Sequence, residues 1–479
     1  MYLSNLLYLK TIELCYYCCE TMNQFHNPIF LSWILKTYLL EINRLRKLNE
    51  EKLKKYQDKC LKNIVKYANS VPLYHDKFKK AGIHPDEIKG IEDIGKLPIV
   101  SKEDIKNYYP DGIISSRIPK EKLISISTSG TTGKSLTIFS DMYDVVRWFF
   151  AYIRVIREYG INWRKDRLTI IGDLAPHTIG TGFTERGLFA NLNNKAYFSN
   201  MQWLNTNDDP RKIIKEVTKF KPDFIGGYPG TLAHLALLKE NGQGKDINPK
   251  YIATIGSVLD KNLKRLIEET FNTHVFEVYG ATESGTIAFQ CKNGHYHIMS
   301  DNVYPEFLKN GEPVDSKVPG HMIITKLSGL GTPIIRYNAI NDIVAPLNEK
   351  CSCGMVGSLI DRIYGRDDLS LCFSGGRILL PSSISEIYSK VLYELKTTKV
   401  KENKIIQHNM NKIEIQLVID NQIKAPPIEK IFSIIKKGFQ EKVGPDVEIQ
   451  IGEIDSVSKE EPRIISKVDT SKFRIHEYI

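Results

Sequence analysis

The alternation of apolar and polar positions changes character along the chain. From Ile42 to Asn69 apolar residues recur at helical spacing, and this pattern stops before Pro72, since proline cannot continue a helix. Residues 1–40 are rich in Leu, Tyr and Ile, which predicts helices packed on the main body. Farther along, short β-rich runs alternate with helical runs, and this predicts an α/β sheet. The predicted strands are residues 168–172, 224–227, 251–256, 275–280 and 322–325, with helices at 211–220 and 261–271.

The pattern changes again after about Arg362. Residues 411–420 alternate between apolar and polar, which predicts a half-exposed strand, and a helix at 428–442 and a strand at 447–451 follow. This α+β texture predicts a small separate domain at the C-terminus. We therefore divide the chain into a helical extension (residues 1–40), a large α/β body (residues 41–364) and a C-terminal domain (residues 365–479).

Composition and charge fit a globular protein of this size. Apolar residues make up 42% and charged residues 25%, which excludes a disordered or collagen-like chain, and 479 residues allow about three domains. No apolar stretch near the N-terminus is long enough to span a bilayer or reads as a signal peptide, so we expect a soluble, cytoplasmic protein without a transmembrane segment. The net charge of +10 favours an anionic partner. Its basic residues are scattered, which favours a solvated surface over a nucleic-acid track, and we expect no nucleic-acid partner.

A glycine-rich segment between two β-like runs is the strongest candidate for phosphate binding. Glycines allow close approach of the backbone to a phosphate, hydroxyls and N–H groups can donate to its oxygens, and Lys134 adds a cation. The run that follows is strand-like, so we predict a strand–loop–strand phosphate loop and not the P-loop of nucleotide triphosphatases. A polar hairpin is the alternative. The candidate residues are Thr128, Ser129, Gly130, Thr131, Thr132 and Gly133.

Three cysteines and a histidine form a second constellation. Cys291 and His297 flank one glycine-containing turn, and Cys351 and Cys353 belong to another. Three thiolates and an imidazole suit tetrahedral Zn²⁺ in a closed structural site, with His295 as the alternative to His297. Reduced free thiols are the rival interpretation. The remaining five cysteines show no metal pattern and are expected to be packing residues.

The glycine-rich loop resembles the signature phosphate loop of the adenylate-forming (AMP-binding) superfamily, which includes acyl–coenzyme A ligases. Three further motifs follow in that family's order: residues 279–283 (Tyr-Gly-Ala-Thr-Glu), Arg336-Tyr337 with Asp342, and residues 365–368 (Gly-Arg-Asp-Asp). Within the superfamily, residues 70–74, 97–104 and 301–306 are typical of the phenylacetate–coenzyme A ligase and CapK-type branch. The resemblance covers about residues 45–470 and implies a nucleotide-binding body with a small, mobile C-terminal domain.

The resemblance implies a role for each motif. Glu283 would ligate Mg²⁺, Thr282 would contact the α-phosphate, and Lys134 with its loop would hold the other phosphates. The adenosine would be held by Tyr279 and Gly280, by Gly256 and Ser257 along the adenine edge, by Asp342 at the ribose and by Arg366. The hinge between the domains would be Asp368, with Asp367 as the alternative in an ambiguous register. Some members of the branch also place a metal at positions that match the cysteine and histidine constellation.

One departure from the family pattern concerns the catalytic lysine. Superfamily ligases carry it near the C-terminus, commonly after a glycine, but here Glu460 or Glu461 aligns with that position. Lys459 or Lys467 can substitute, although neither has the Gly-Lys context, and a glutamate would repel the phosphate.

Together these features predict an ATP-dependent enzyme that activates an aryl or acyl carboxylic acid as acyl-AMP and transfers it to coenzyme A. ATP, Mg²⁺, coenzyme A and structural Zn²⁺ are the expected cofactors, and the resemblance allows a homodimer. Two alternatives stay open. One is a nucleotidyl transferase acting on a deazaflavin coenzyme or a polysaccharide precursor, and the other is a catalytically degenerate ATP-binding protein.

Overall fold

The computed structural model describes residues 27–128, 136–181, 198–458, 461–468 and 477–478. The predicted loop residues Ser129 to Lys134 and the candidate Lys459 lie outside this part of the chain, as does most of the N-terminal extension. Among the described residues, no helix is long and apolar enough to cross a membrane.

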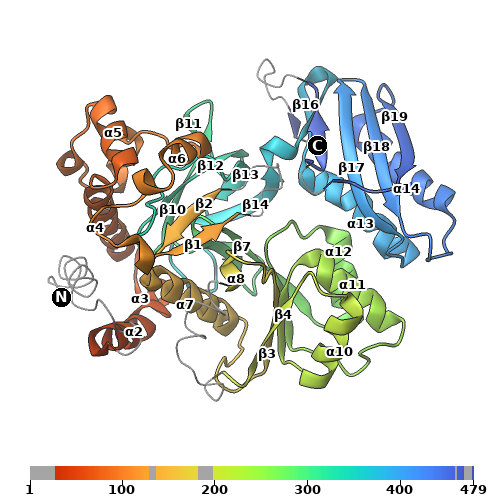
Figure 1. Ribbon diagram of the computed structural model, residues 1–479, viewed down its shortest axis with the longest axis horizontal. Coiled ribbons are helices and arrows are strands. Elements are labelled where there is room, and N and C mark those ends of the chain that lie inside the picture. The colour runs from red at the N-terminus through yellow and green to blue at the C-terminus, as the bar shows by residue number, and fades with distance from the viewer. Residues whose placement is uncertain (1–26, 129–135, 182–197, 459–460, 469–476, 479) are drawn as a thin grey trace.

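One mixed sheet of twelve strands runs through the body and confirms the predicted α/β class (Figure 1). Strands β4, β3, β5, β6 and β7 lie side by side and parallel, and β7 joins them to an antiparallel half. Across the sheet the order is β11-β10-β12-β13-β14-β9-β8-β7-β6-β5-β3-β4. In chain order the strands are β3 Leu168–Gly172, β4 Met201–Asn205, β5 Phe224–Gly227, β6 Tyr251–Thr254, β7 His274–Ala281, β8 Gly285–Gln290, β9 Tyr296–Ile298, β10 Val303–Lys309, β11 Glu312–Pro313, β12 Gly320–Lys326, β13 Asp342–Leu347 and β14 Leu359–Arg366.

Helices cover the sheet and make two apolar cores in the body. Helices α10, α11 and α12 follow the parallel strands and bury Leu232 and Phe271 in one core, and α10 and α12 are amphipathic. The larger core gathers apolar side chains from the N-terminal helices, from α7 and from the antiparallel half. The body helices are α2 Pro28–Glu41, α3 Arg44–Lys47, α4 Glu50–Ala68, α5 Pro72–Ala81, α6 Lys102–Tyr108, α7 Met142–Glu158, α8 Ile179–Thr181, α10 Pro210–Phe220, α11 Pro229–Glu240 and α12 Lys261–Phe271.

The helical pattern predicted from Ile42 to Asn69 does not form one helix. The chain leaves helix at Leu48, and α4 begins afresh at Glu50. Asn49 adopts an extended conformation there, and its side chain accepts a hydrogen bond from the backbone N–H of Lys52. The capping asparagine therefore starts a new helix, although the apolar residues keep helical spacing on both sides of it.

The C-terminal residues build their own core. Phe373, Ile415 and Phe439 are buried in a cluster separate from those of the body. Figure 1 shows this part (blue) beside α11 and α12. Its elements are β15 Leu371–Phe373, β16 Arg377–Leu379, α13 Pro381–Leu395, β17 Val400–Asn409, β18 Lys412–Ile419, α14 Ile428–Val443, β19 Glu448–Ile454, β20 Ile464–Ser466 and β21 Glu477–Tyr478. A core of its own supports a separate domain, and residue 365 as its first residue stays a prediction.

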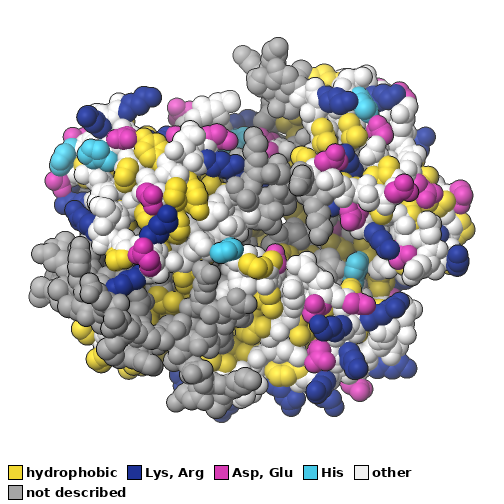
Figure 2. Space-filling view, viewed as in Figure 1, with side chains coloured by type: hydrophobic (Ala, Val, Ile, Leu, Met, Phe, Trp, Pro, Cys, Tyr) yellow, Lys and Arg dark blue, Asp and Glu magenta, His cyan; other side chains and the backbone are white. Residues whose placement is uncertain are grey.

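Charges of both signs are interspersed on the face shown in Figure 2, where Lys and Arg side chains alternate with Asp and Glu. Many described lysines are paired with nearby acids, for example Lys212 with Asp208 (2.9 Å) and Lys317 with Glu349 (2.8 Å). The excess of positive charge is thus distributed over a solvated surface on this face.

Candidate functional site

Strand β7 carries the Tyr-Gly-Ala-Thr-Glu motif and turns sharply into β8. Gly280 lies opposite Thr286, and a Cβ atom at Gly280 would come within 2.7 Å of the carbonyl oxygen of Gly285. Only glycine allows the two backbones to come so close. The turn after Gly280 holds Thr282 half-buried and Glu283 buried, with 7% of the latter exposed.

The motif residues from distant parts of the chain converge beside this turn. The Tyr337 hydroxyl donates to Oε1 of Glu283 (3.3 Å), and the Tyr279 hydroxyl donates to Oδ2 of Asp342. Asp342 and Arg366 are paired across β13 and β14. The structure therefore brings together Tyr279, Glu283, Asp342 and Arg366.

Burial dominates the acid–base properties of this group. It raises the pKa of Asp342 to about 6, although the Tyr279 hydroxyl and Arg366 favour the ionised form. It also raises the pKa of Glu283, against the opposing effects of Tyr337, Lys102 and Arg366. Buried carboxylates with raised pKa values cluster at functional sites, because a ligand or a metal must complete their surroundings.

Two residues near the site had no role in the motif-based prediction. Lys102, the first residue of α6, was not predicted as a site residue. Its pKa is lowered, mainly by burial and further by Lys106 and Arg366, while Glu283 has the opposite effect. Arg336, the motif arginine, is turned away from the cluster and donates to Glu306 (3.0 and 2.9 Å) and to the Leu97 carbonyl (2.7 Å). Lys102 follows the helix-capping Ser101, and nothing in its spacing distinguishes it from other surface lysines.

The loop after β6 lies at the carboxyl ends of the parallel strands, where α/β sheets bind ligands. Gly256 and Ser257 are exposed there. Gly256 has a φ of 87°, and a Cβ atom would come within 2.3 Å of the Tyr228 ring. The loop therefore passes closely over Tyr228 and presents its backbone to solvent.

The two strands that flank the glycine-rich loop confirm the strand–loop–strand prediction. Strand β1 (Ile124–Ser127) pairs antiparallel with β2 (Thr137–Ser140). The Thr128 N–H donates to the carbonyl oxygen of Leu136 (2.8 Å), and the Thr128 hydroxyl accepts from the Leu136 N–H (2.9 Å). Thr128 thus closes the base of the loop, whose further residues lie outside the described chain.

The predicted hinge residues directly follow β14, whereas the candidate lysine Lys467 lies after β20 in the C-terminal part. Arg366 donates to Asp368 through two hydrogen bonds (2.9 and 2.6 Å), and Asp367 is tied to the Asn341 carbonyl through its backbone N–H (2.6 Å). Lys467 follows β20, and its Nζ lies 3.3 Å from Nδ1 of His408. No hydrogen bond or ion pair among the described residues joins Lys467 to the cluster around Glu283.

The four predicted metal ligands lie close together in the structure. The ligand atoms of Cys291, His297, Cys351 and Cys353 all lie within 4.8 Å of one another. The Sγ atoms of Cys291 and Cys351 are 3.7 Å apart, and Sγ of Cys353 is 3.2 Å from Nε2 of His297. A Zn–S distance of about 2.3 Å corresponds to tetrahedral ligand separations of about 3.8 Å. Burial lowers the pKa of His297 to about 4, so its imidazole is neutral and able to bind a metal.

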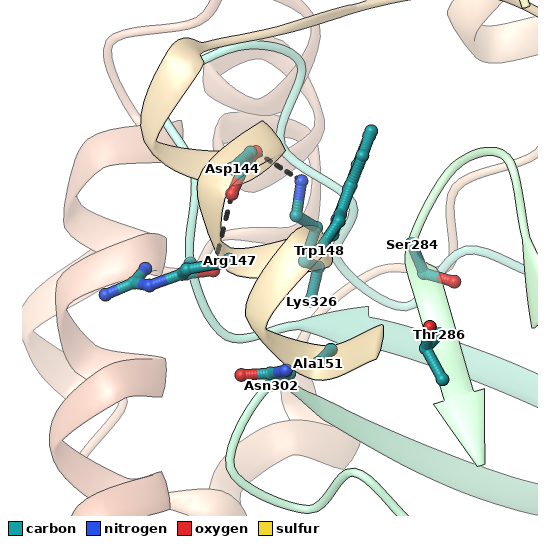
Figure 3. A pocket seen from close by; sticks show the side chains of 9 residues that line it. Asp144, Arg147, Trp148, Ala151, Ser284, Thr286, Asn302 and Lys326 are labelled. Atoms are coloured by element: carbon teal, nitrogen blue, oxygen red, sulfur yellow. Dashed lines mark hydrogen bonds and ion pairs between the residues drawn. The ribbon is translucent and has the colours of Figure 1, made fainter. Parts of the chain in front are cut away.

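A small pocket of about 10 Å³ lies directly behind the motif turn (Figure 3). Helix α7 contributes Asp144 and Trp148 to it, while Ser284 and Thr286 approach from the turn and β8. Lys326 pairs with Asp144 at 2.5 Å and lies over the Trp148 ring. Such a volume holds about one water molecule, so this pocket does not accommodate an aromatic acid in the observed conformation.

No protein-family model matches the chain, but individual proteins are similar to it. The chain is 27% identical to a phenylacetate–coenzyme A ligase of Pseudomonas putida over 350 residues, covering 71% of this chain and 76% of the relative. It is 26% identical to protein CapK of Staphylococcus aureus over 392 residues, covering 81% and 82%. The crystal structure of a 2-hydroxyisobutyryl-CoA ligase in its postadenylation state superposes with a TM-score of 0.69 at 18% identity, covering 89% of this chain and 92% of that one.

Proposed function

Since the chain is an enzyme of the adenylate-forming superfamily, in the branch of the phenylacetate–coenzyme A ligases and CapK-type proteins, we propose that it activates a carboxylic acid with ATP and transfers it to coenzyme A. In the first step a carboxylate oxygen of the acid attacks the α-phosphorus of ATP, and the bond to the pyrophosphate oxygen breaks. In the second step the sulfur of coenzyme A attacks the acyl carbon, and AMP leaves. The observation that carries the proposal is the convergence of Tyr279, Glu283, Asp342 and Arg366.

Glu283 is suited to hold Mg²⁺ against the phosphates. Its carboxylate is buried, Tyr337 donates to Oε1, and a carboxylate is a ligand that a hard cation prefers. Bound Mg²⁺ would offset negative charge on the phosphates during transfer. Thr282, the neighbour of Glu283, would contact the α-phosphate.

The pair of Tyr279 and Asp342 is suited to bind the adenosine. An ionised Asp342 would accept hydrogen bonds from the ribose hydroxyls, and Arg366 would hold it in the charged form. The Tyr279 ring would lie against the adenine, with Gly256 and Ser257 offering backbone groups along its edge. The loop with Lys134 would hold the β- and γ-phosphates, and Asp368 would serve as the hinge.

The test is ATP–pyrophosphate exchange over a panel of aryl, hydroxy and aliphatic acids. We expect exchange with at least one acid, and a loss of about 10²-fold or more in Glu283→Gln, because an electrostatic contact to the transferred group is removed. Glu441→Gln, which changes an exposed glutamate of α14, is the matched control and should exchange at the wild-type rate. ATP binding without exchange for any acid would contradict the proposal.

A nucleotidyl transfer that does not use coenzyme A is the second candidate. It is favoured by the likeness to protein CapK and by the region of the missing Gly-Lys motif, where Glu461 is paired with Lys404 (2.6 Å). Release of an AMP-modified product without coenzyme A would establish it, whereas a strict coenzyme A requirement would exclude it.

The four-residue cluster is proposed to hold structural Zn²⁺. Its ligand separations and its neutral histidine fit that ion, and four protein ligands leave no open position for substrate. The ion would join two turns and would take no part in the reaction.

A further inference from the structure

A second, larger cavity is lined by no described residue of the four adenylate-forming motifs. It has a volume of about 380 Å³, within the range of about 300–1,000 Å³ that is usual for small-molecule sites. Helices α3 and α7, side by side in Figure 1, form its walls together with the turn after β8. Its polar lining consists of Asn43, Arg46, Arg154, Arg157, Glu158 and Lys292.

Two of the four cations in this lining are neutralised by the protein itself. Arg154 is only 3% exposed and donates to both carboxylate oxygens of Asp301 (2.8 and 2.7 Å). Arg46 donates to Glu158 (2.8 Å) and to the Cys353 carbonyl (2.8 Å). These two pairs therefore add little net charge to the cavity wall.

The other two cations have no such partner. Arg157 in the last turn of α7 forms no ion pair with any carboxylate that the structure describes, and the same holds for Lys292. The Lys292 ammonium lies 5.1 Å from the Tyr251 ring centroid. It also lies 3.3 Å from where a Cβ atom of Gly160 would be, so a residue with a side chain there would crowd it. The cavity therefore keeps two uncompensated positive charges.

We propose that this cavity binds a small phosphomonoester whose remainder is polar. Such a ligand carries a charge of about −1.5 to −2 at neutral pH, which matches the two free cations. The guanidinium fork of Arg157 suits a phosphate group, and Lys292 adds a point charge. The Asn43 amide and the Glu158 carboxylate can hydrogen-bond hydroxyl groups. This site does not depend on the proposed ligase activity.

The test is isothermal titration with inorganic phosphate and with glycerol 3-phosphate, at an ionic strength held constant by sodium chloride. We expect glycerol 3-phosphate to bind and to lose at least tenfold in affinity in the double variant Arg157→Gln/Lys292→Gln. Lys292→Arg should retain affinity within about threefold. Glu158→Gln, which removes the one carboxylate of the described lining, should bind tighter. Arg157 and Lys292 are exposed, so the double variant should fold, which circular dichroism and the Tm without ligand check.

A control separates this cavity from the proposed nucleotide site. Lys134→Gln should leave glycerol 3-phosphate binding unchanged. Binding that is lost in Lys134→Gln and kept in the double variant would overturn the proposal, as would no binding to the wild type. Acetate that binds as tightly as glycerol 3-phosphate would also overturn the phosphate assignment.

Discussion

At the scale of single residues, the site places two carboxylates where water is scarce. Glu283 and Asp342 are 7% and 8% exposed, and each has one tyrosine hydroxyl as a donor. Burying a charged group is unfavourable unless it is paired. Arg366 lies across from Asp342 and favours its ionised form, and Lys102 and Arg366 oppose the rise in the pKa of Glu283. The protein thus holds carboxylates ready for a cation and for ligand hydroxyls.

The raised pKa of Asp342 predicts a pH dependence of stability. An aspartate has a pKa of about 3.9 in an unfolded chain, against about 6 in the folded protein. The folded state therefore binds this proton more tightly, and the unfolding free energy falls as pH rises from about 4 to about 6, by about 3 kcal/mol in full. Asp342→Asn should lose this part of the slope, which Tm measured across that range would detect.

The exposed Asp361 supplies the control for this experiment. Asp361→Asn should keep the wild-type slope, because its carboxylate is solvated. The raised pKa of Glu283 adds a slope of the same sign, and this part should remain in Asp342→Asn. Identical Tm profiles for wild type and Asp342→Asn would contradict the prediction.

Motif spacing selected Glu283 and Asp342 from short local patterns, and the structure buries both in one cluster, while their roles stay predictions. It assigned no direction to the Arg336 side chain, which is set by Glu306 and by the Leu97 carbonyl, far away in sequence. It also missed Lys102, since the nearness of a lysine on α6 to the turn after β7 is a tertiary property. Residue type was therefore predictable, but side-chain direction was not.

At the scale of elements, prediction succeeded where an apolar pattern was bounded by clear stop signals. Strand β3 and helix α12 have the predicted limits, since Gly172 follows four β-type residues and Asp260 caps the helix. It failed at Leu48, where one capping side chain divides a continuous pattern. The metal cluster likewise depends on two turns about 60 residues apart in sequence, which only the sheet brings together.

Removing this cluster is expected to loosen the two turns. We expect about one Zn²⁺ per chain in the wild type and almost none in Cys291→Ser/Cys351→Ser, because two of the four thiolate and imidazole ligands are lost. The Tm should fall by several degrees in the variant, and a chelator should lower the wild-type Tm in the same way. Elemental analysis and thermal unfolding measure both effects.

Cys372→Ser provides the matched control, since Cys372 is a buried free cysteine outside the cluster. It should keep the full zinc content. A wild-type protein purified without chelator that carries no zinc, or equal zinc in both variants, would contradict the prediction.

At the scale of the whole molecule, the packing of α12 against α13 is one of several contacts that join the C-terminal part to the body. Asp260 caps α12 through the N–H groups of Asn262 (3.0 Å) and Leu263 (3.1 Å). The same carboxylate accepts hydrogen bonds from the hydroxyls of Ser385 (2.8 Å) and Ser389 (2.6 Å) on α13. If the C-terminal part rotates between two half-reactions, as the family resemblance implies, both of these bonds must break in each cycle.

Removing the two serine hydroxyls should therefore weaken the observed arrangement without harming α12. Ser385→Ala/Ser389→Ala keeps the helix cap but loses two hydrogen bonds to a charged acceptor, which are worth about 1.5–3 kcal/mol each. We expect faster hydrogen exchange along α13 and, if this arrangement serves adenylation, ATP–pyrophosphate exchange at least tenfold slower.

Ser383→Ala is the control, because the Ser383 hydroxyl makes no hydrogen bond among the described residues. Unchanged hydrogen exchange in the double variant would show that the two bonds do not hold the C-terminal part in place. Altered hydrogen exchange with an unchanged reaction rate would show instead that this arrangement is not the adenylating one.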